Sequence, residues 1–174
     1  MKLLTLKITS EFRNLKGLNL NFDSANDTYV IIGNNGTGKT NILEALSGVF
    51  SILLSHSTDF LFSFVLRYEI NDINYRVKHD MIYPNRIVCN YSGEDTRMWD
   101  NYYKKANEEY LESVRTAEAP NVLSMIYIDR TMWKYILLCM LATRDVNIAF
   151  DKFLREKLGI TFGNLDFIEL KFNT

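Results

Sequence analysis

The chain has 174 residues, of which 47% are hydrophobic and 24% are charged, and its net charge at pH 7 is −1. These proportions are typical of a globular domain and exclude a disordered or fibrous protein. The near-zero net charge provides no general basic field that would favour nucleic acid or an anionic lipid surface as a partner. No apolar run approaches the roughly 20 residues that span a bilayer. We therefore expect a cytoplasmic protein without membrane contact.

The first third of the chain predicts a strand pair, a buried strand and a helix. Residues 2–9 and 18–23 alternate between apolar and polar side chains, which predicts an antiparallel pair with one solvent-exposed face. Residues 28–32 are continuously apolar and rich in β-branched side chains, which predicts a central strand buried on both faces. Residues 39–54 are apolar over most of a helical circumference, so we expect a helix buried between layers.

The rest of the chain mixes β and helical patterns. Residues 60–70 and 73–78 flank Asn71-Asp72 and predict a hairpin. Short apolar or alternating segments predict further strands at residues 86–91, 122–128 and 165–172. Apolar residues at helical spacing predict helices at residues 95–118, 131–143 and 146–158, the last of which ends at Gly159.

The segment between the predicted strand and the first predicted helix carries the chemistry. Its sequence, Gly33-Asn34-Asn35-Gly36-Thr37-Gly38-Lys39-Thr40, matches the pattern G-x-x-x-x-G-K-[ST] at every defined position. Glycines let consecutive backbone N–H groups approach phosphate oxygens where a Cβ would clash. The helix N-terminus adds unpaired N–H groups and the positive end of the helix dipole. We therefore predict a loop that binds ATP, with Lys39 on the β- and γ-phosphates and the Thr40 hydroxyl on Mg²⁺.

Two stretches within residues 1–46 resemble a known group of ATPases. The motif continues into a helix as Gly38-Lys39-Thr40-Asn41-Ile42-Leu43-Glu44-Ala45-Leu46, and upstream residues 8–22 carry Phe12-Arg13 between two predicted strands. Both stretches are similar to the ABC-type ATPases of the RecF, SMC and overcoming-lysogenisation-defect group. The more diffuse pattern after residue 84 resembles AAA-family ATPases associated with restriction and phage-defence systems.

The resemblance implies a set of nucleotide-binding residues. Arg13 matches an arginine that lies near the nucleotide in relatives, although an exposed arginine at a strand end would have the same sequence. The complete predicted ATP-binding set is Arg13, Gly33, Asn34, Asn35, Gly36, Thr37, Gly38, Lys39, Thr40 and Asn41.

ABC-type hydrolysis needs further parts, and the sequence provides only partial matches to them. Tyr91-Ser92-Gly93-Glu94 resembles part of a signature motif but lacks its full context. Residues 122–128 followed by Asp129 resemble a Walker B strand, but Arg130 stands where the catalytic Glu would be. Asp129 is equally suited to cap a helix that begins near Thr131. No histidine follows His79 that could serve as the switch residue.

These observations predict an α/β fold, the N-terminal lobe of a P-loop ATPase. We expect a mixed sheet around the phosphate-binding loop and an antiparallel β-hairpin subdomain. The expected segments are a nucleotide-binding core at 1–56, the β subdomain at 57–92 and a largely helical part at 93–174.

The functional hypothesis is ATP binding by a RecF/SMC-like lobe. Hydrolysis is then expected only in a complete protein, which acts with DNA or a nuclease in DNA maintenance or phage defence. Alternatives are a compact complete ATPase that uses Ser92 and Asp129, a small-molecule P-loop phosphotransferase, and a non-catalytic nucleotide-gated interaction module. We also expect self-association through residues 120–174.

Overall fold

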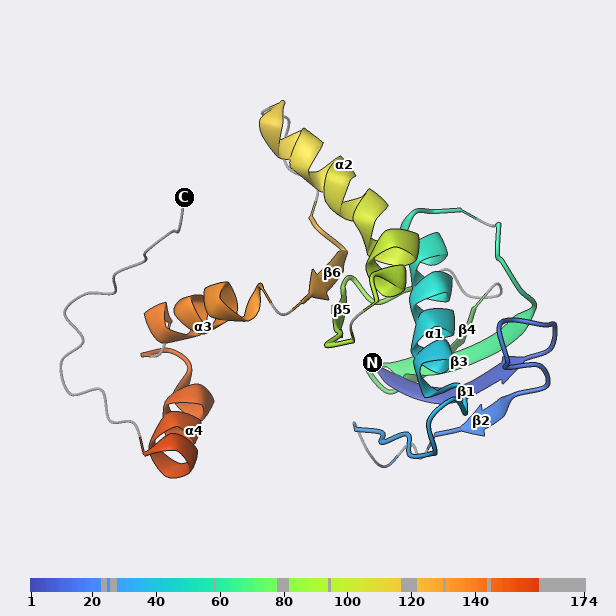
Figure 1. Ribbon diagram of the computed structural model, residues 1–174, viewed down its shortest axis with the longest axis horizontal. Coiled ribbons are helices and arrows are strands. Elements are labelled where there is room, and N and C mark those ends of the chain that lie inside the picture. The colour runs from blue at the N-terminus through green and yellow to red at the C-terminus, as the bar shows by residue number, and fades with distance from the viewer. Residues whose placement is uncertain are drawn as a thin grey trace. The chain divides into compact units, whose positions relative to one another are not determined.

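The computed structural model describes residues 1–22, 25, 28–57, 59–77, 82–93, 95–116, 122–129, 131–143 and 145–159. The chain forms two compact units, Met1–Ile128 and Asp129–Thr174 (Figure 1). The predicted strand at 165–172 lies outside the described residues. None of the helices in the described ranges combines the length and apolar character that crossing a bilayer requires.

The first unit contains a four-stranded antiparallel sheet with the strand order β2-β1-β3-β4. The pairing of β1 with β2 and of β3 with β4 confirms the predicted strand pair and hairpin. The hairpin turns at Asn71 and Asp72, whose φ angles of 51° and 62° are those of a type I′ turn. Residues 60–63 precede β3 and do not belong to it, which corrects the predicted start of the hairpin. The strands are β1 Lys2–Ile8, β2 Asn19–Asn21, β3 Phe64–Ile70 and β4 Ile73–Arg76.

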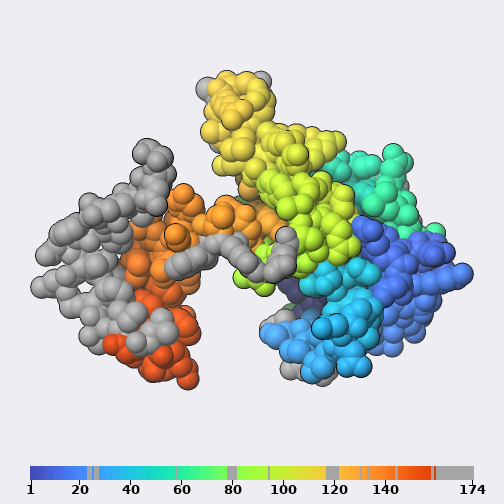
Figure 2. Space-filling model, in the orientation of Figure 1, coloured from blue at the N-terminus to red at the C-terminus, as the bar shows by residue number. Residues whose placement is uncertain are grey.

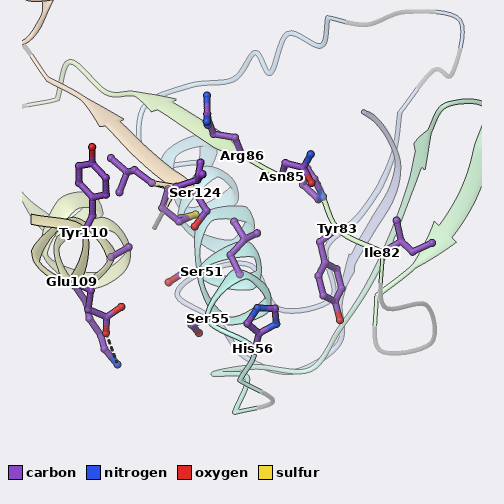
Figure 3. A pocket seen from close by; sticks show the side chains of 17 residues that line it. Ser51, Ser55, His56, Ile82, Tyr83, Asn85, Arg86, Glu109, Tyr110 and Ser124 are labelled. Carbon is purple, nitrogen blue, oxygen red and sulfur yellow. Dashed lines mark ion pairs between the residues drawn. The ribbon is translucent and has the colours of Figure 1, made fainter. Parts of the chain in front are cut away.

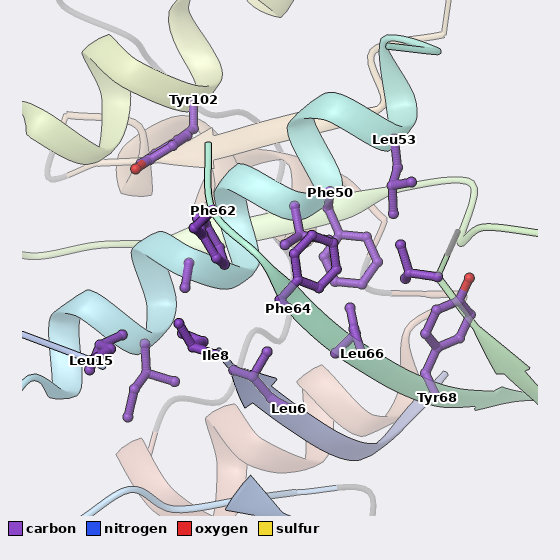
Figure 4. Packing of buried hydrophobic residues seen from close by; sticks show 14 of the residues in the cluster. Leu6, Ile8, Leu15, Phe50, Leu53, Phe62, Phe64, Leu66, Tyr68 and Tyr102 are labelled. Carbon is purple, nitrogen blue, oxygen red and sulfur yellow. The ribbon is translucent and has the colours of Figure 1, made fainter. Parts of the chain in front are cut away.

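Helix α1 (Lys39–Leu54) covers one face of this sheet, and its bounds are those predicted (Figures 1 and 4). Alternate residues of β1 and β3 point into the core, because successive side chains of a strand lie on opposite faces. Full burial of each large apolar side chain contributes roughly 1.5–3 kcal/mol. The buried side chains therefore hold α1 in place on the sheet. The buried core residues of these three elements are Leu6, Ile8, Ile42, Ala45, Val49, Phe50, Leu53, Phe64, Leu66 and Tyr68.

A second sheet and a long helical segment complete the first unit. Strand β5 (Ile87–Asn90) pairs in parallel with β6 (Met125–Ile128), as expected for the strands predicted there. The predicted helix 95–118 is present, but it opens with a π-helical turn, η1 (Trp99–Tyr103), before α2 (Lys104–Arg115). The wider π turn lets two consecutive tyrosines, Tyr102 and Tyr103, both point into the core.

The prediction of a central strand at 28–32 is wrong. This segment is extended, but among the described residues it pairs with neither sheet. Val30 is 77% exposed and Ile32 is 88% exposed. Tyr29 anchors the segment through a hydrogen bond of 3.0 Å from its hydroxyl to the Leu3 carbonyl oxygen and through an edge contact with the Phe22 ring. An apolar, β-branched run favours extended backbone, but a strand also needs hydrogen bonds to a neighbouring strand, and residues 28–32 form none with the described strands.

The described part of the second unit consists of α3 (Trp133–Ala142) and α4 (Ile148–Leu158). These helices confirm the predictions at 131–143 and 146–158. The Asn147 side chain caps α4 by accepting the Phe150 N–H at 3.2 Å. Gly159 ends α4 in the left-handed conformation, with φ of 64°, as the sequence indicated.

A candidate phosphate-binding loop

The loop Gly33–Thr37 is exposed and leads directly into α1, and Figure 2 shows this part of the chain in light blue at the surface. Gly36 and Gly38 have φ angles of 82° and 96°, which side-chain-bearing residues rarely adopt. A Cβ on Gly38 would lie 2.7 Å from Asn14 Oδ1 and 2.9 Å from a methyl of Leu15. Glycine is therefore required at position 38 both by backbone conformation and by space.

The N-terminus of α1 lacks a side-chain cap from the described residues, because its N-cap position is Gly38. The first bond within the helix runs from Ile42 N–H to the Gly38 carbonyl oxygen at 3.0 Å. The amides of Lys39, Thr40 and Asn41 precede that bond and have no intrahelical acceptor. Together with the positive end of the helix dipole, they form an arrangement suited to an anion.

The Lys39 ammonium lies over the loop. Its Nζ donates to the carbonyl oxygens of Gly33 and Asn34, each at 2.7 Å. The loop is closed further by the Thr37 hydroxyl, which donates to the same Asn34 oxygen at 2.8 Å. Two neutral carbonyl oxygens hold the ammonium without neutralising it, so its charge stays available to an anionic ligand. Thr40 lies in the first turn of α1 and is half-buried.

A second segment, Phe12–Leu15, packs against the glycine loop. Asn14 Nδ2 donates to the Gly36 carbonyl oxygen at 3.0 Å, and Asn41 Nδ2 donates to Asn14 Oδ1 at 2.7 Å. Asn14 therefore bridges the loop and the first turn of α1. The sequence analysis did not identify this role of Asn14, although the residue directly follows Arg13 in the predicted connection between two strands.

Arg13 has a backbone φ of 55° and donates from Nε to Glu44 Oε2 at 3.2 Å. Glu44 is 1% exposed and receives a second guanidinium on its other oxygen, since Arg97 Nη2 lies 3.4 Å from Oε1. The structure thus brings the predicted residue Arg13 beside the first two turns of α1. The sequence analysis did not identify the pairing of Glu44 with Arg97. The signal for it was Glu44 itself, because a single acidic residue on a helix otherwise apolar around its circumference indicates a buried ion pair.

The segment after β5, which includes the signature-like Ser92-Gly93, folds around Asp95. Asp95 accepts hydrogen bonds from the Tyr91 hydroxyl at 3.3 Å and from Arg97 Nη2 at 3.3 Å. The Arg97 guanidinium lowers the pKa of Asp95 below its usual value. Ser92 and Gly93 are exposed. Arg97 therefore joins this turn to the buried carboxylate of Glu44.

The Walker B-like candidate, Asp129, directly follows the carboxyl end of β6. Its Oδ1 accepts the Thr131 N–H and hydroxyl, each at 2.7 Å, and the Met132 N–H at 3.1 Å. These bonds lower the pKa of the Asp129 carboxyl, with the Thr131 hydroxyl as the largest cause. This geometry is that of a carboxylate capping the start of a helical segment.

A hollow of about 1080 Å³ lies at the opposite end of α1 (Figure 3). Its walls include Ser51, Ser55 and His56 from the end of α1, and Glu109 and Tyr110 from α2. The helix has 16 residues, so this end lies about 24 Å from the glycine loop. The carbonyl end of a helix dipole is negative and disfavours phosphate, so size alone does not identify the candidate phosphate site.

The α/β architecture with antiparallel and parallel sheets fits a P-loop ATPase fold. The chain belongs to the AAA ATPase domain family, whose model matches residues 1–161. This membership supports an ATP-binding, AAA-type ATPase function in general. No curated protein and no solved structure matches the chain.

Proposed function

We propose that this chain binds Mg-ATP at the loop Gly33–Thr40. The observation that carries the proposal is the position of Lys39 Nζ, held by two loop carbonyl oxygens beside the open N-terminus of α1. A triphosphate there would accept from the free amides and from the ammonium at once. Charge-assisted bonds of this kind are about twice as strong as neutral ones.

The residues present fit a triphosphate with Mg²⁺. Gly38 leaves space at the helix end where a Cβ would crowd Asn14, and Asn34 to Thr37 are exposed. Thr40 would bind Mg²⁺ through its hydroxyl, since hard cations prefer oxygen ligands. Bound Mg²⁺ would offset the negative charge of the β- and γ-phosphates. Asn41 holds Asn14 against the loop, and Arg13 stands nearby as a second cation.

We further propose that the chain acts as a nucleotide-binding lobe of a RecF/SMC-like ATPase in DNA maintenance or phage defence. The support is the resemblance across residues 1–46 and the family membership. The sequence contains no Asp-Glu pair after an apolar strand, and water-positioning and electrostatic groups supply most of a phosphoryl-transfer rate. Hydrolysis is therefore assigned to an assembly that contributes those groups, with DNA or a nuclease as its partner.

Isothermal titration calorimetry with Mg-ATP tests the binding site. Lys39→Ala removes a charged donor worth roughly 1.5–3 kcal/mol, so the affinity should fall about 10- to 150-fold. Lys105→Ala is the matched control, because Lys105 is an exposed lysine of the same unit that pairs with Glu109 on α2. Equal affinity of the Lys39→Ala variant and the unmodified chain would overturn the assignment.

A further inference from the structure

One buried carboxylate in the first unit is shared by two arginines that come from distant parts of the sequence. Glu44 is 1% exposed, while the side chains of Arg13 and Arg97 are 40% and 45% exposed. Each arginine takes a different oxygen of Glu44, at 3.2 Å and 3.4 Å. A buried charge is tolerated only when it is paired, and loss of one partner leaves it partly uncompensated.

This carboxylate lies close to the candidate phosphate site. Glu44 follows Thr40 by four residues on α1, so the two side chains are neighbours on one helix face. Side chains on a helix lean toward its N-terminus, and the Glu44 carboxylate is accordingly bonded to Arg13, the residue before Asn14. Asn14 in turn contacts the Gly36 carbonyl oxygen. A negative charge at Glu44 would therefore oppose a polyphosphate on the loop unless it is neutralised.

The two arginines have different further partners, which are Tyr102 for Arg13 and Asp95 for Arg97. Arg97 is bound by Asp95 as well as by Glu44, through the same Nη2 atom, at 3.3 Å and 3.4 Å. Arg97 is followed by η1, which packs along the same face of α1. Tyr103 shares a hydrogen bond of 3.0 Å with Ser47, and a Cβ on Gly48 would lie 3.0 Å from the Tyr102 ring. These contacts fix η1, and with it the chain next to Arg97, relative to α1.

We propose that Arg97 is a positioning residue for the nucleotide site, which neutralises Glu44 and so frees the charge of Arg13 to act on the bound phosphates. The inference rests on the proposed binding of Mg-ATP at Gly33–Thr40. Without Arg97, the single carboxylate of Glu44 retains Arg13 as its main partner, and the pair contributes no net positive charge beside the loop. Arg97 thus acts on affinity through Glu44 and not by touching the nucleotide.

A double-mutant cycle on the full chain tests this proposal. Mg-ATP and AMP are each titrated into four proteins: the unmodified chain, Arg97→Gln, Glu44→Gln and the double variant. Arg97→Gln should weaken Mg-ATP binding about three- to tenfold, with a smaller loss for AMP because fewer phosphate charges are present. In the Glu44→Gln background, the same change should alter affinity by less than about twofold. The buried charge that Arg97 neutralises is then absent, and its other partner, Asp95, is solvent-exposed, so solvent screens the charge left there.

Three results would overturn the inference: unchanged Mg-ATP affinity in Arg97→Gln, an equal loss in both backgrounds, or an equal loss for AMP. Arg97→Lys keeps the positive charge and should bind within about twofold of the unmodified chain, so it serves if the Gln variant does not fold.

Arg115→Gln, which breaks an exposed pair with Glu112, is the matched control. Failure of the unmodified chain to bind Mg-ATP would instead remove the proposed function itself.

Discussion

The N-termini of α1 and α4 are satisfied in opposite ways. Helix α4 begins with Asn147, whose side chain accepts the Phe150 N–H, and it carries Asp151 in its first turn. Helix α1 begins with Gly38, has no acidic residue in its first turn and starts with Lys39. The side chains of Asn147 and Asp151 thus offset the free amides and the positive dipole end of α4. The first turn of α1 has no such acceptor and instead adds the positive charge of Lys39.

The difference separates a helix end that the chain itself caps from the helix end at which we propose that Mg-ATP binds. Capping side chains contribute typically about 1 kcal/mol of stability, and α1 lacks that contribution. Its stability comes from burial, since most of its length packs on the sheet (Figure 4). A helix held firmly by its core can leave its first turn open, and only such a helix can place unpaired amides accurately for a phosphate.

The largest effect is expected from closing the open end of α1. Gly38→Ala combines a strained φ of 96° with contacts of 2.7 Å and 2.9 Å to Asn14 and Leu15. We expect about 2–4 kcal/mol of destabilisation and a fall in Mg-ATP affinity of about 100-fold, measured by chemical denaturation and calorimetry.

Gly36→Ala is the matched variant for this prediction. Its φ of 82° is also positive, but no atom lies within 4 Å of the added Cβ. It should show only the conformational strain of about 1–2 kcal/mol. If both variants lose equal stability, the packing of Asn14 on the loop is not what requires glycine at position 38.

A smaller effect is expected from opening the closed end of α4. Asn147→Ala removes the acceptor of the Phe150 N–H and should destabilise the helix by about 1 kcal/mol. Hydrogen exchange of the amides in residues 148–158, followed by mass spectrometry, would report this loss locally. Mg-ATP affinity should not change, and a parallel loss of affinity would contradict the separation of the two helix ends.

The start of α3 should show a pH dependence through Asp129. Hydrogen bonds from Thr131 and Met132 hold the folded-state pKa of Asp129 below the ordinary value of 3.8. The stabilisation is therefore fully present above pH 3.8 and is lost as the pH falls through the lower folded-state pKa. Protection of the amides in residues 133–142 against hydrogen exchange, relative to the intrinsic rate at each pH, should fall in acid more steeply in the unmodified chain than in Asp129→Asn.

The smallest change is expected in ATP turnover. Because Asp129 is engaged as a cap and Arg130 follows it in place of a Glu, the purified chain should hydrolyse ATP at the background rate. Asp129→Asn should leave that rate unaltered in a phosphate-release assay. Robust turnover that disappears in this variant would favour the compact ATPase with Asp129 as its Walker B residue.

Local chemistry made several features of this protein predictable. The bounds of α1, the Asn71-Asp72 turn and the Gly159 helix end each depend on residues within a few positions of one another. The candidate phosphate loop belongs to the same class, because its glycines, lysine and helix start are contiguous. The π turn was not predictable from spacing, since Tyr102 and Tyr103 are buried by their contacts with α1.

The sequence by itself determined the nature of the loop at Gly33–Thr40, because backbone freedom and charge at adjacent positions need no distant partner. Only the tertiary structure decided that residues 28–32 stay unpaired among the described strands, and that Arg13 and Arg97 share Glu44. Strand pairing and buried ion pairs both require groups from remote segments to come within a few ångströms of one another. Here the packing of α1 on its sheet and of η1 on α1 decides which groups meet.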